Sequence, residues 1–252
     1  MSINIEKIKE AAEIIRKSRY TVAFTGAGIS VESGIPPFRG PGGLWNQYDP
    51  VILDLTYYIQ HSEESWPVVK KLFFDFFGSA KPNAAHHALA QMEGQGMLRE
   101  IITQNIDNLH QEAGSSRVYE FHGNSRQFIC LDCGKVYQRT GLELTDSPPH
   151  CLSKACKGLL KPDFIFFGEG IPEDAYSASL HAAQHAEVFI LIGTTGEIMP
   201  ASQIPVIAKQ NGARIIEVNI SESNFTPQIT DIFLQGKATE VMEALLGKLN
   251  ND

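Results

Sequence analysis

Short apolar segments alternate along the chain with segments in which apolar residues recur every three or four positions. A short apolar run is typical of a strand buried on both faces, whereas the longer spacing is typical of a helix with one buried face. The predicted strands are Thr21 to Thr25, Glu100 to Thr103, Val118 to His122, Val188 to Ile192 and Ile215 to Asn219. The predicted helices are Asn83 to Gln95, Ile106 to Ala113, Glu173 to His185, Pro200 to Gln210 and Ala238 to Leu249. This alternation predicts the α/β class, with an open parallel sheet covered by helices on both faces.

Two segments interrupt the alternation. The first opens with a loop rich in glycine and proline and contains an aromatic helical segment, Trp66 to Phe77, and the second carries every cysteine of the chain. We therefore predict a Rossmann-like domain and a smaller domain inserted into it. The large domain takes residues 1–30, 82–125 and 161–252, and the small domain combines a loop and helical insertion, residues 31–81, with a metal-binding module, residues 126–160.

The first residues predict a surface helix. Ser2 to Lys17 spaces Ile5, Ile8 and Ile15 at helical intervals among charged residues, whereas a secretory signal needs an unbroken apolar stretch. No segment stays apolar for the roughly 18 residues of a membrane span. We therefore expect a cytoplasmic protein that makes no membrane contact.

The charge balance bears on the class of partner. The formal net charge is −8 and no long run of lysine and arginine interrupts it, so the chain has no field that would hold a phosphate backbone. We expect no nucleic-acid partner, whereas a basic peptide would be attracted.

The four cysteines lie in one stretch with a recognisable spacing. Cys130 and Cys133 are separated by two residues, and Cys151 and Cys156 follow after 17 residues. In a reducing compartment such clusters more often bind metal than form disulfides. Four thiolates complete a tetrahedral zinc site and leave no open position for water, which predicts one structural zinc per chain. The alternative is four reduced thiols without a metal.

A glycine-rich turn follows the first predicted strand. Gly26 to Ser30 would let main-chain amides approach a phosphate at the start of a helix. Val31 stands where the dehydrogenase fingerprint has a small residue, and an ordinary strand-to-helix turn is the alternative. The continuation, Val31 to Gly40, has too much glycine and proline for a helix and predicts a long mobile loop ending in Phe38 and Arg39.

Polar side chains follow two further predicted strands. Asn105 and Asp107 lie just beyond one strand end, at the edge where open α/β sheets bind ligands; the alternative for either residue is a helix cap. His122 ends another strand beside Gly123, where a histidine can act as a general base near neutral pH or be purely structural.

These segments together resemble the sirtuin family. The likeness is carried by Gly26 to Gly40, Gln104 to Asp107, Phe121 to Gly123, the four cysteines, Phe167 to Glu169 and Gly193 to Thr195, in this order and at these spacings. It covers the chain from about Ala11 to Met242. The resemblance implies an NAD-dependent protein lysine deacylase, most simply a deacetylase, which cleaves NAD to nicotinamide and yields free lysine and O-acyl-ADP-ribose. Its partners would be acyl-lysine proteins or peptides.

The resemblance also implies roles for individual residues. His122 would be the base, with Asn105 and Asp107 orienting the ribose and the nicotinamide amide. Residues expected to bind NAD are Gly26, Ala27, Gly28, Ile29, Phe38, Arg39, Gln104, Asn105, Ile106, Asp107, His122, Gly193, Thr194, Thr195, Asn219 and Ala238. Residues expected to bind the peptide, which would add a strand by main-chain bonding, are Phe167, Gly168, Glu169, Gly196 and Ile198.

Two departures from the family pattern bear on the acyl group. Gly196 to Met199 stands where many sirtuins have a leucine and paired valines, and Val68 and Lys71 stand where enzymes for acidic acyl groups have a tyrosine and an arginine. A lysine offers no bidentate fork for a carboxylate, so we expect a neutral acyl group, acetyl first and longer chains second. The apolar wall would come from Phe73, Phe74, Phe76 and Phe77, which otherwise simply form the helix core.

Other functions remain to be separated from deacylation. Protein mono-ADP-ribosyl transfer uses the same NAD cleavage but hands the sugar to a side chain, and product mass distinguishes the two. A non-catalytic NAD sensor would not need the base at His122, and a dehydrogenase would have no use for the cysteine module.

Overall fold

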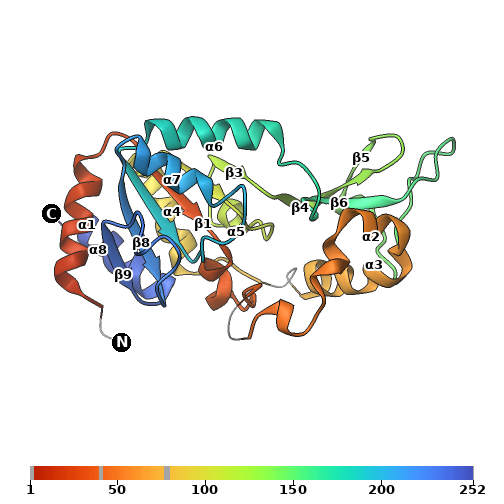
Figure 1. The fold of residues 1–252 in the computed structure, drawn as a ribbon, viewed down its shortest axis with the longest axis horizontal. Helices are drawn as coiled ribbons and strands as arrows, with labels where there is room; N and C mark the ends of the chain where they lie inside the picture. The colour runs from red at the N-terminus through yellow and green to blue at the C-terminus, as the bar shows by residue number, and fades with distance from the viewer. Residues whose placement is uncertain (1–2, 40–41, 77–79, 252) are drawn as a thin grey trace.

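The computed structural model describes residues 3–39, 42–76 and 80–251. A six-stranded parallel sheet forms the centre of the larger lobe, in the strand order β3-β2-β1-β7-β8-β9 (Figure 1). Its strands are β1 (Thr21–Thr25), β2 (Glu100–Thr103), β3 (Val118–Glu120), β7 (Val188–Ile192), β8 (Arg214–Asn219) and β9 (Ile232–Gln235). The predicted Rossmann-like open parallel sheet is confirmed, and its strand order reverses between β1 and β7, which makes a switch point at its centre.

Helices cover both faces of this sheet because both faces are apolar. One face packs against α1 (Ile5–Lys17), α4 (Ala84–Gly94) and α8 (Ala238–Asn250), and the other against α6 (Glu173–His185) and α7 (Gln203–Gln210). The strands β1 and β7 are buried at every position. The side chain of Asn83 caps α4, and that of His86 accepts from the Asn83 main chain in return.

The smaller lobe lies at one end of the sheet domain, and both chain ends lie at the opposite end (Figure 1). It contains a three-stranded antiparallel sheet of β4 (Gly123–Cys130), β5 (Val136–Gln138) and β6 (Leu160–Phe164). The helices α2 (Leu55–Gln60) and α3 (Ser62–Lys70) and a π-helical segment, Lys71–Phe76, come from the first insertion. Side chains of both insertions share one core, so the two segments fold together.

Several elements differ from those predicted. The helix expected from Ile106 to Ala113 is only α5 (Leu109–Glu112), because Asn108 has a left-handed backbone with a φ of 65° and Asp107 accepts the Leu109 N–H. The loop expected from Val31 onward begins inside a 3₁₀-helical segment, Ala27–Ser33, which Gly34 ends with a φ of 91°. Left-handed residues at these two points shorten one helix and stop the other.

Four strands escaped prediction. The strands β4 and β6 carry polar and charged residues that interrupt any apolar run, and β5 has only three residues. The strand β9 is as long as β2 and was nevertheless missed. Pairing in the small sheet, rather than burial on both faces, stabilises β4, and the strands β4 and β6 both extend beyond residues 126–160. Among the described residues, no helix is both long enough and apolar enough to span a membrane.

Candidate active site

A cavity of about 610 Å³ opens between the two lobes, at the carboxyl ends of the central strands. Cavities of roughly 300–1,000 Å³ are typical of ligand sites, and this edge of an open sheet is where such ligands bind. The walls come from the turn after β1, the segments after β2 and β3, the stretch after β6, and the loops after β7 and β8. Parallel strand ends therefore bring together residues far apart in the sequence.

Two glycine turns touch at the floor of this cavity. A Cβ on Gly28 would lie 2.5 Å from Cα of Gly193, and a Cβ on Gly26 would lie 2.8 Å from the Gly193 carbonyl oxygen. The Gly28 N–H donates to that same oxygen at 2.9 Å. Only glycine allows main chain to approach main chain this closely. The contact places the start of the 3₁₀-helical segment at the cavity wall, where an anionic phosphate group is favoured.

His122 lies just after β3 and borders the cavity. Its Nδ1 is 3.0 Å from the carbonyl oxygen of Gln104. Because a carbonyl only accepts, Nδ1 carries the proton and Nε2 of the neutral ring keeps its lone pair. Burial lowers the pKa of His122, and the Gln104 carbonyl opposes that shift in part. The ring is therefore neutral near pH 7 and equipped to accept a proton.

Ser30 organises the polar residues beneath the cavity. Its hydroxyl donates to Oδ2 of Asp107 at 2.7 Å and accepts from Nδ2 of Asn105 at 3.2 Å. The His86 ring approaches the same oxygen at 3.4 Å. Burial raises the pKa of Asp107, whereas its bonds from Ser30 and Leu109 act in the opposite direction. Sequence reasoning missed Ser30, whose only signal was its place in the glycine-rich turn.

Asn105 and Asp107 thus have different surroundings. Asn105 lines the cavity and also donates to the Gly26 carbonyl at 3.2 Å. Asp107 does not line it; one carboxylate oxygen binds Ser30 and the other caps α5. The capping role and the site role that the sequence left as alternatives for Asp107 are compatible, because its two oxygens serve different partners.

The loop after β1 supplies the outer wall. Phe38 packs against Trp45 and Phe73, with ring centroids 5.5 and 6.3 Å away. Arg39 is 3.6 Å from the carboxylate of Glu197, which belongs to the loop after β7. The Arg39 guanidinium is therefore held at the cavity mouth by a partner that is partly exposed to water.

Polar side chains also connect the loops at the end of the cavity away from Phe38. The Gln104 side chain donates to Oγ1 of Thr194 at 3.1 Å, and Asn219 donates to the Thr194 carbonyl at 3.0 Å. Glu217, two residues earlier, is buried and accepts from the hydroxyls of Ser223, Thr226 and Thr230, so it anchors the following loop. Lys237 and Glu222 also line this end and were not predicted.

The segment predicted to bind peptide is itself joined to the insertion. Phe167 donates to the Leu53 carbonyl at 2.7 Å, and its own carbonyl accepts from Leu55 at 3.0 Å. Among the described residues, Gly168 forms no main-chain hydrogen bond, so its N–H and C=O remain for an added strand. The Phe167 side chain is 44% exposed at the cavity rim.

Most of the residues predicted to bind NAD or the peptide line the cavity, and three do not. Ile29 is buried in the core against α1 and α4, Asp107 lies behind Asn105, and Gly196 packs against Phe225 beside a separate cavity. Phe73 lines the cavity as well as being buried, whereas Phe74 stacks on Phe128 in the core. The side chains of Phe76 and Phe77 lie outside the described residues.

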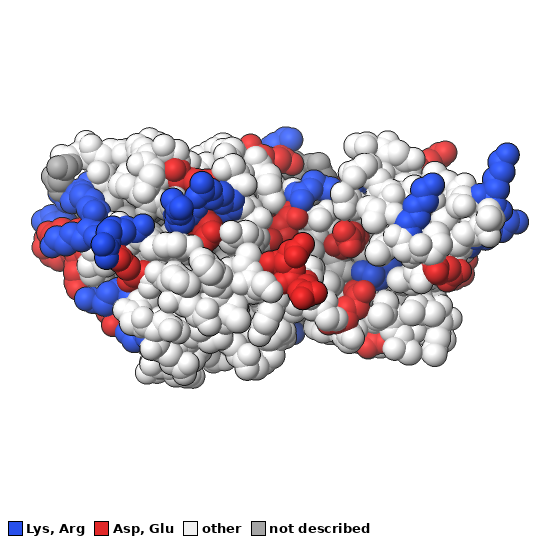
Figure 2. Space-filling view, turned by 90° about the horizontal axis from the view of Figure 1, so that it is seen from above, with Lys and Arg blue, Asp and Glu red and all other residues white. Residues whose placement is uncertain are grey.

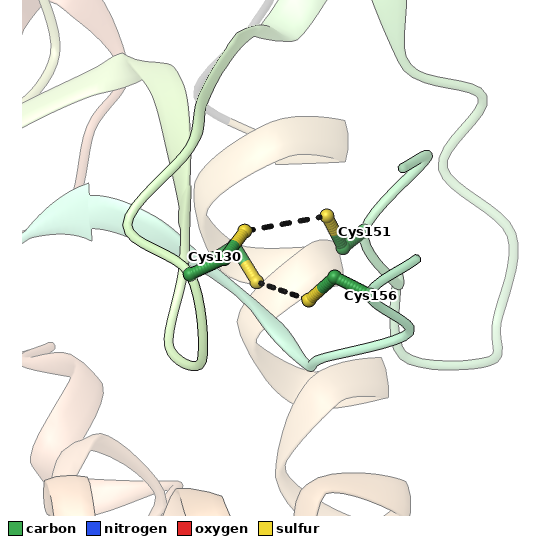
Figure 3. A group of neighbouring side chains, drawn as sticks. Cys130, Cys151 and Cys156 are labelled. Atoms are coloured by element: carbon green, nitrogen blue, oxygen red, sulfur yellow. Dashed lines mark hydrogen bonds between the residues drawn. The ribbon is translucent and has the colours of Figure 1, made fainter. Parts of the chain in front are cut away.

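The four cysteines converge in the small lobe, and Figure 3 labels Cys130, Cys151 and Cys156 of this cluster. Their sulfur atoms all lie within 4.8 Å of one another, with 3.7 Å between Cys130 and Cys156 and 3.8 Å between Cys133 and Cys151. Tetrahedral zinc with Zn–S bonds of about 2.3 Å needs sulfurs roughly 3.8 Å apart, whereas a disulfide needs about 2 Å. The donor set fits a closed zinc site, and zinc would cross-link β4 to the loop before β6.

Comparisons with known proteins agree with this geometry. A model of the Sir2 family matches residues 26–200. The NAD-dependent protein deacylase 2 of Pyrobaculum aerophilum is 42% identical, with 93% of each chain covered. The NAD-dependent protein deacylase of Pyrococcus furiosus is 41% identical, with 95% of this chain and 97% of its own covered.

Solved structures extend the likeness to three dimensions. A complex of Sir2 with a p53 peptide and NAD⁺ gives a TM-score of 0.87 at 35% identity, covering 96% of this chain and 98% of its own. A Sir2 homologue in complex with ADP-ribose gives 0.90 at 38% identity, covering 95% of each chain.

Proposed function

Because the chain belongs to the Sir2 family, we propose that it is an NAD-dependent protein lysine deacylase and that acetyl-lysine is among its substrates. NAD supplies an electrophilic ribose carbon, which loses nicotinamide and takes up the acyl oxygen of the modified lysine. The cavity suits such a dinucleotide because a helix start, close-packed glycine turns and one arginine border the same space. The zinc site belongs to the small lobe and takes no part in the reaction.

The observation that carries the proposal is the state of His122. A neutral imidazole with Nδ1 fixed on the Gln104 carbonyl presents Nε2 as the proton acceptor at the cavity wall. This is the arrangement needed to take a proton from a ribose hydroxyl. Asn105 is held by Ser30 and Gly26 and orients polar groups of the ligand, and Asp107 acts through Ser30.

The remaining wall residues exclude water and hold charge. Phe38 covers the reacting end of the cavity as part of an aromatic group with Trp45 and Phe73. Arg39 provides positive charge for the diphosphate and exchanges Glu197 for it as a partner. Positioning and exclusion of water are what this reaction requires, since no protein nucleophile takes part.

The residues of the inner cavity wall indicate which acyl group the site accepts. Trp45, Leu53, Phe73 and Phe164 line the cavity, whereas Val68 and Lys71 do not. The Lys71 ammonium lies 6.0 Å from the centroid of the Tyr48 ring. An apolar wall without a cation favours a neutral acyl chain over an acidic one.

The peptide chemistry is consistent with the surface. On the face seen in Figure 2, acidic side chains gather near the narrow junction of the two lobes, with some lysines and arginines beside them and more toward the two ends. A lysine-rich peptide is attracted to such a junction, and its main chain pairs with the free N–H and C=O of Gly168.

The test combines one substrate panel with one variant. The purified protein is incubated with NAD and with acetyl-, longer acyl- and succinyl-lysine peptides, and nicotinamide release and peptide mass are followed together. We expect loss of neutral acyl groups and little reaction with succinyl-lysine. A target that gains ADP-ribose while every peptide keeps its acyl group would move the assignment to ADP-ribosyl transfer.

The variant His122→Ala isolates the base. Deacylation should be abolished, while the NAD dissociation constant stays within about tenfold, equivalent to roughly 1.4 kcal/mol. The control is His181→Ala, which removes an exposed imidazole from α6. Substantial turnover in His122→Ala would remove His122 from the reaction.

A further inference from the structure

A buried ion pair lies directly beneath the peptide-binding edge. Lys161 of β6 is 3% exposed, and its ammonium is 2.9 Å from the carboxylate of Glu169. The same ammonium donates to the carbonyls of Pro162 and Phe164, at 2.7 Å each, and lies 4.7 Å from the centroid of the Phe166 ring. All three N–H donors of this ammonium therefore have partners within one short segment.

Glu169 completes a closed loop of contacts. Its carboxylate accepts the Phe166 N–H at 2.6 Å, and its own N–H donates to the Phe166 carbonyl at 3.0 Å. The chain from 162 to 169 is thus folded back on itself, with the Lys161 ammonium inside the fold. Burying a lysine is costly unless it is paired and fully hydrogen-bonded, so this segment has one strongly preferred conformation.

That conformation fixes two connections of the active site. The Ile165 N–H donates to the carbonyl of His122 at 2.8 Å, next to the proposed base. Phe167 bonds on either side of Asp54 in the insertion. Gly168, the residue whose main-chain groups are free to meet a peptide, directly follows the second connection.

We propose that Lys161 and Glu169 are positioning residues that hold the peptide-binding edge ready for the substrate. This inference rests on the proposed deacylase function. Neither side chain needs to contact the reacting atoms, because the pair acts through the conformation of residues 164–168. The carboxylate of Glu169, which the sequence suggested as a peptide contact, serves instead inside the protein.

The pair predicts a selective kinetic defect. If the peptide-binding edge is disordered, it must become ordered when the peptide binds. The free energy of that ordering is lost from the binding free energy, so the affinity for the peptide falls. The NAD side of the cavity is built from the turns after β1 and β7, which the pair does not touch. Lys161→Met should therefore raise KM for an acetyl-lysine peptide by at least tenfold and leave KM for NAD within about twofold. Lys161→Arg keeps the cation and should restore most of the loss.

A double variant protects the test against unfolding. Removing one partner leaves a buried charge, whereas replacing both by apolar residues of similar size is often neutral for stability. Lys161→Met combined with Glu169→Met should therefore melt near the wild-type temperature yet keep the raised peptide KM. Faster amide exchange at Phe166 and Phe167 should accompany it. Glu173→Gln, which removes an exposed carboxylate at the start of α6, is the matched charge control.

The outcomes separate the two proposals. A folded double variant with the wild-type peptide KM and unchanged exchange at Phe166 and Phe167 overturns the positioning role. Equal losses for peptide and NAD would also overturn it, since they would indicate general structural damage. A wild-type protein that deacylates no peptide refutes the proposed function instead, and amide exchange then still measures whether the pair orders this segment.

Discussion

The contact between the two glycine turns predicts that one chemical change has opposite effects at two positions. Glycine to alanine should destabilise the protein at position 28 and stabilise it at position 94. Gly28→Ala adds one methyl group where a Cβ would lie 2.5 Å from Cα and 2.8 Å from the carbonyl oxygen of Gly193. Carbon atoms in contact normally stay about 3.5–4.0 Å apart, so the overlap is roughly 1 Å. Both neighbours are main chain and cannot rotate away. One of the two turns must move.

The magnitude follows from the cost of overpacking. Forcing an extra methyl group into a well-packed site costs about 1–3 kcal/mol, and in a chain of this length each kcal/mol lowers the Tm by roughly 2–4 °C. We expect Gly28→Ala to lower the Tm by about 2–12 °C. It should also raise the KM for NAD, because Gly26, Gly28 and Gly193 all border the cavity.

The matched control is Gly94→Ala at the end of α4. A Cβ there would meet nothing within 4 Å, so the methyl group only reduces the freedom of the unfolded chain. Alanine at such a helical position stabilises by about 0.5–1 kcal/mol. Thermal unfolding followed by circular dichroism, with NAD kinetics on the same samples, measures both variants. A Gly28→Ala protein with an unchanged Tm and an unchanged KM for NAD would refute the close-contact reasoning.

Two further predictions concern the zinc module and acid stability. The Tyr137 hydroxyl lies 3.0 Å from the sulfur of Cys151 and stabilises its thiolate. Tyr137→Phe should therefore lower the affinity for zinc at least tenfold, measured by competition with a chromogenic chelator. The control Tyr57→Phe, which removes a hydroxyl bonded to Glu64, should leave that affinity unchanged. Burial lowers the pKa of His86 from 6.5 to about 4 in the folded protein. Between pH 6.5 and about pH 4 the unfolded chain therefore binds a proton at this histidine that the folded chain does not. The free energy of unfolding falls as the pH drops through this range. In urea unfolding, His86→Gln should reduce the loss of stability between pH 7 and pH 5 by about 2 kcal/mol, whereas His87→Gln, which changes an exposed ring, should leave that loss unchanged; an equal loss in all three proteins would contradict the assignment.

Local patterns were enough to predict most elements of the large domain, although not β9. The strand β7 is apolar at every position and β1 at its three central positions, which is the pattern of strands buried on both faces. The polar strands β4 and β6 gave no such signal. Their pairing joins residues from both sides of the cysteine stretch, and a partner distant in sequence cannot be found from the composition of a single strand.

The aromatic segment shows the same limit within one turn of helix. Phe73 and Phe74 are neighbours of the same residue type, and no periodicity distinguishes their uses. In the structure Phe73 faces Phe38 and the cavity, whereas Phe74 stacks on Phe128. The direction of each ring depends on how the insertion packs against β4 and β6, which is a property of the assembled small lobe.

The sequence by itself determined the chemistry that is encoded locally. Four cysteines at metal-binding spacing, a glycine-rich turn after a buried strand, and a histidine at a strand end are each visible in a few adjacent residues. Only the tertiary structure decided how these groups act on one another. The Gln104 carbonyl sets the tautomer of His122, Ser30 joins Asn105 to Asp107, and Glu169 turns inward to Lys161. Hydrogen bonds and ion pairs depend on distance in space, and parallel strand ends bring together side chains that the chain itself keeps far apart.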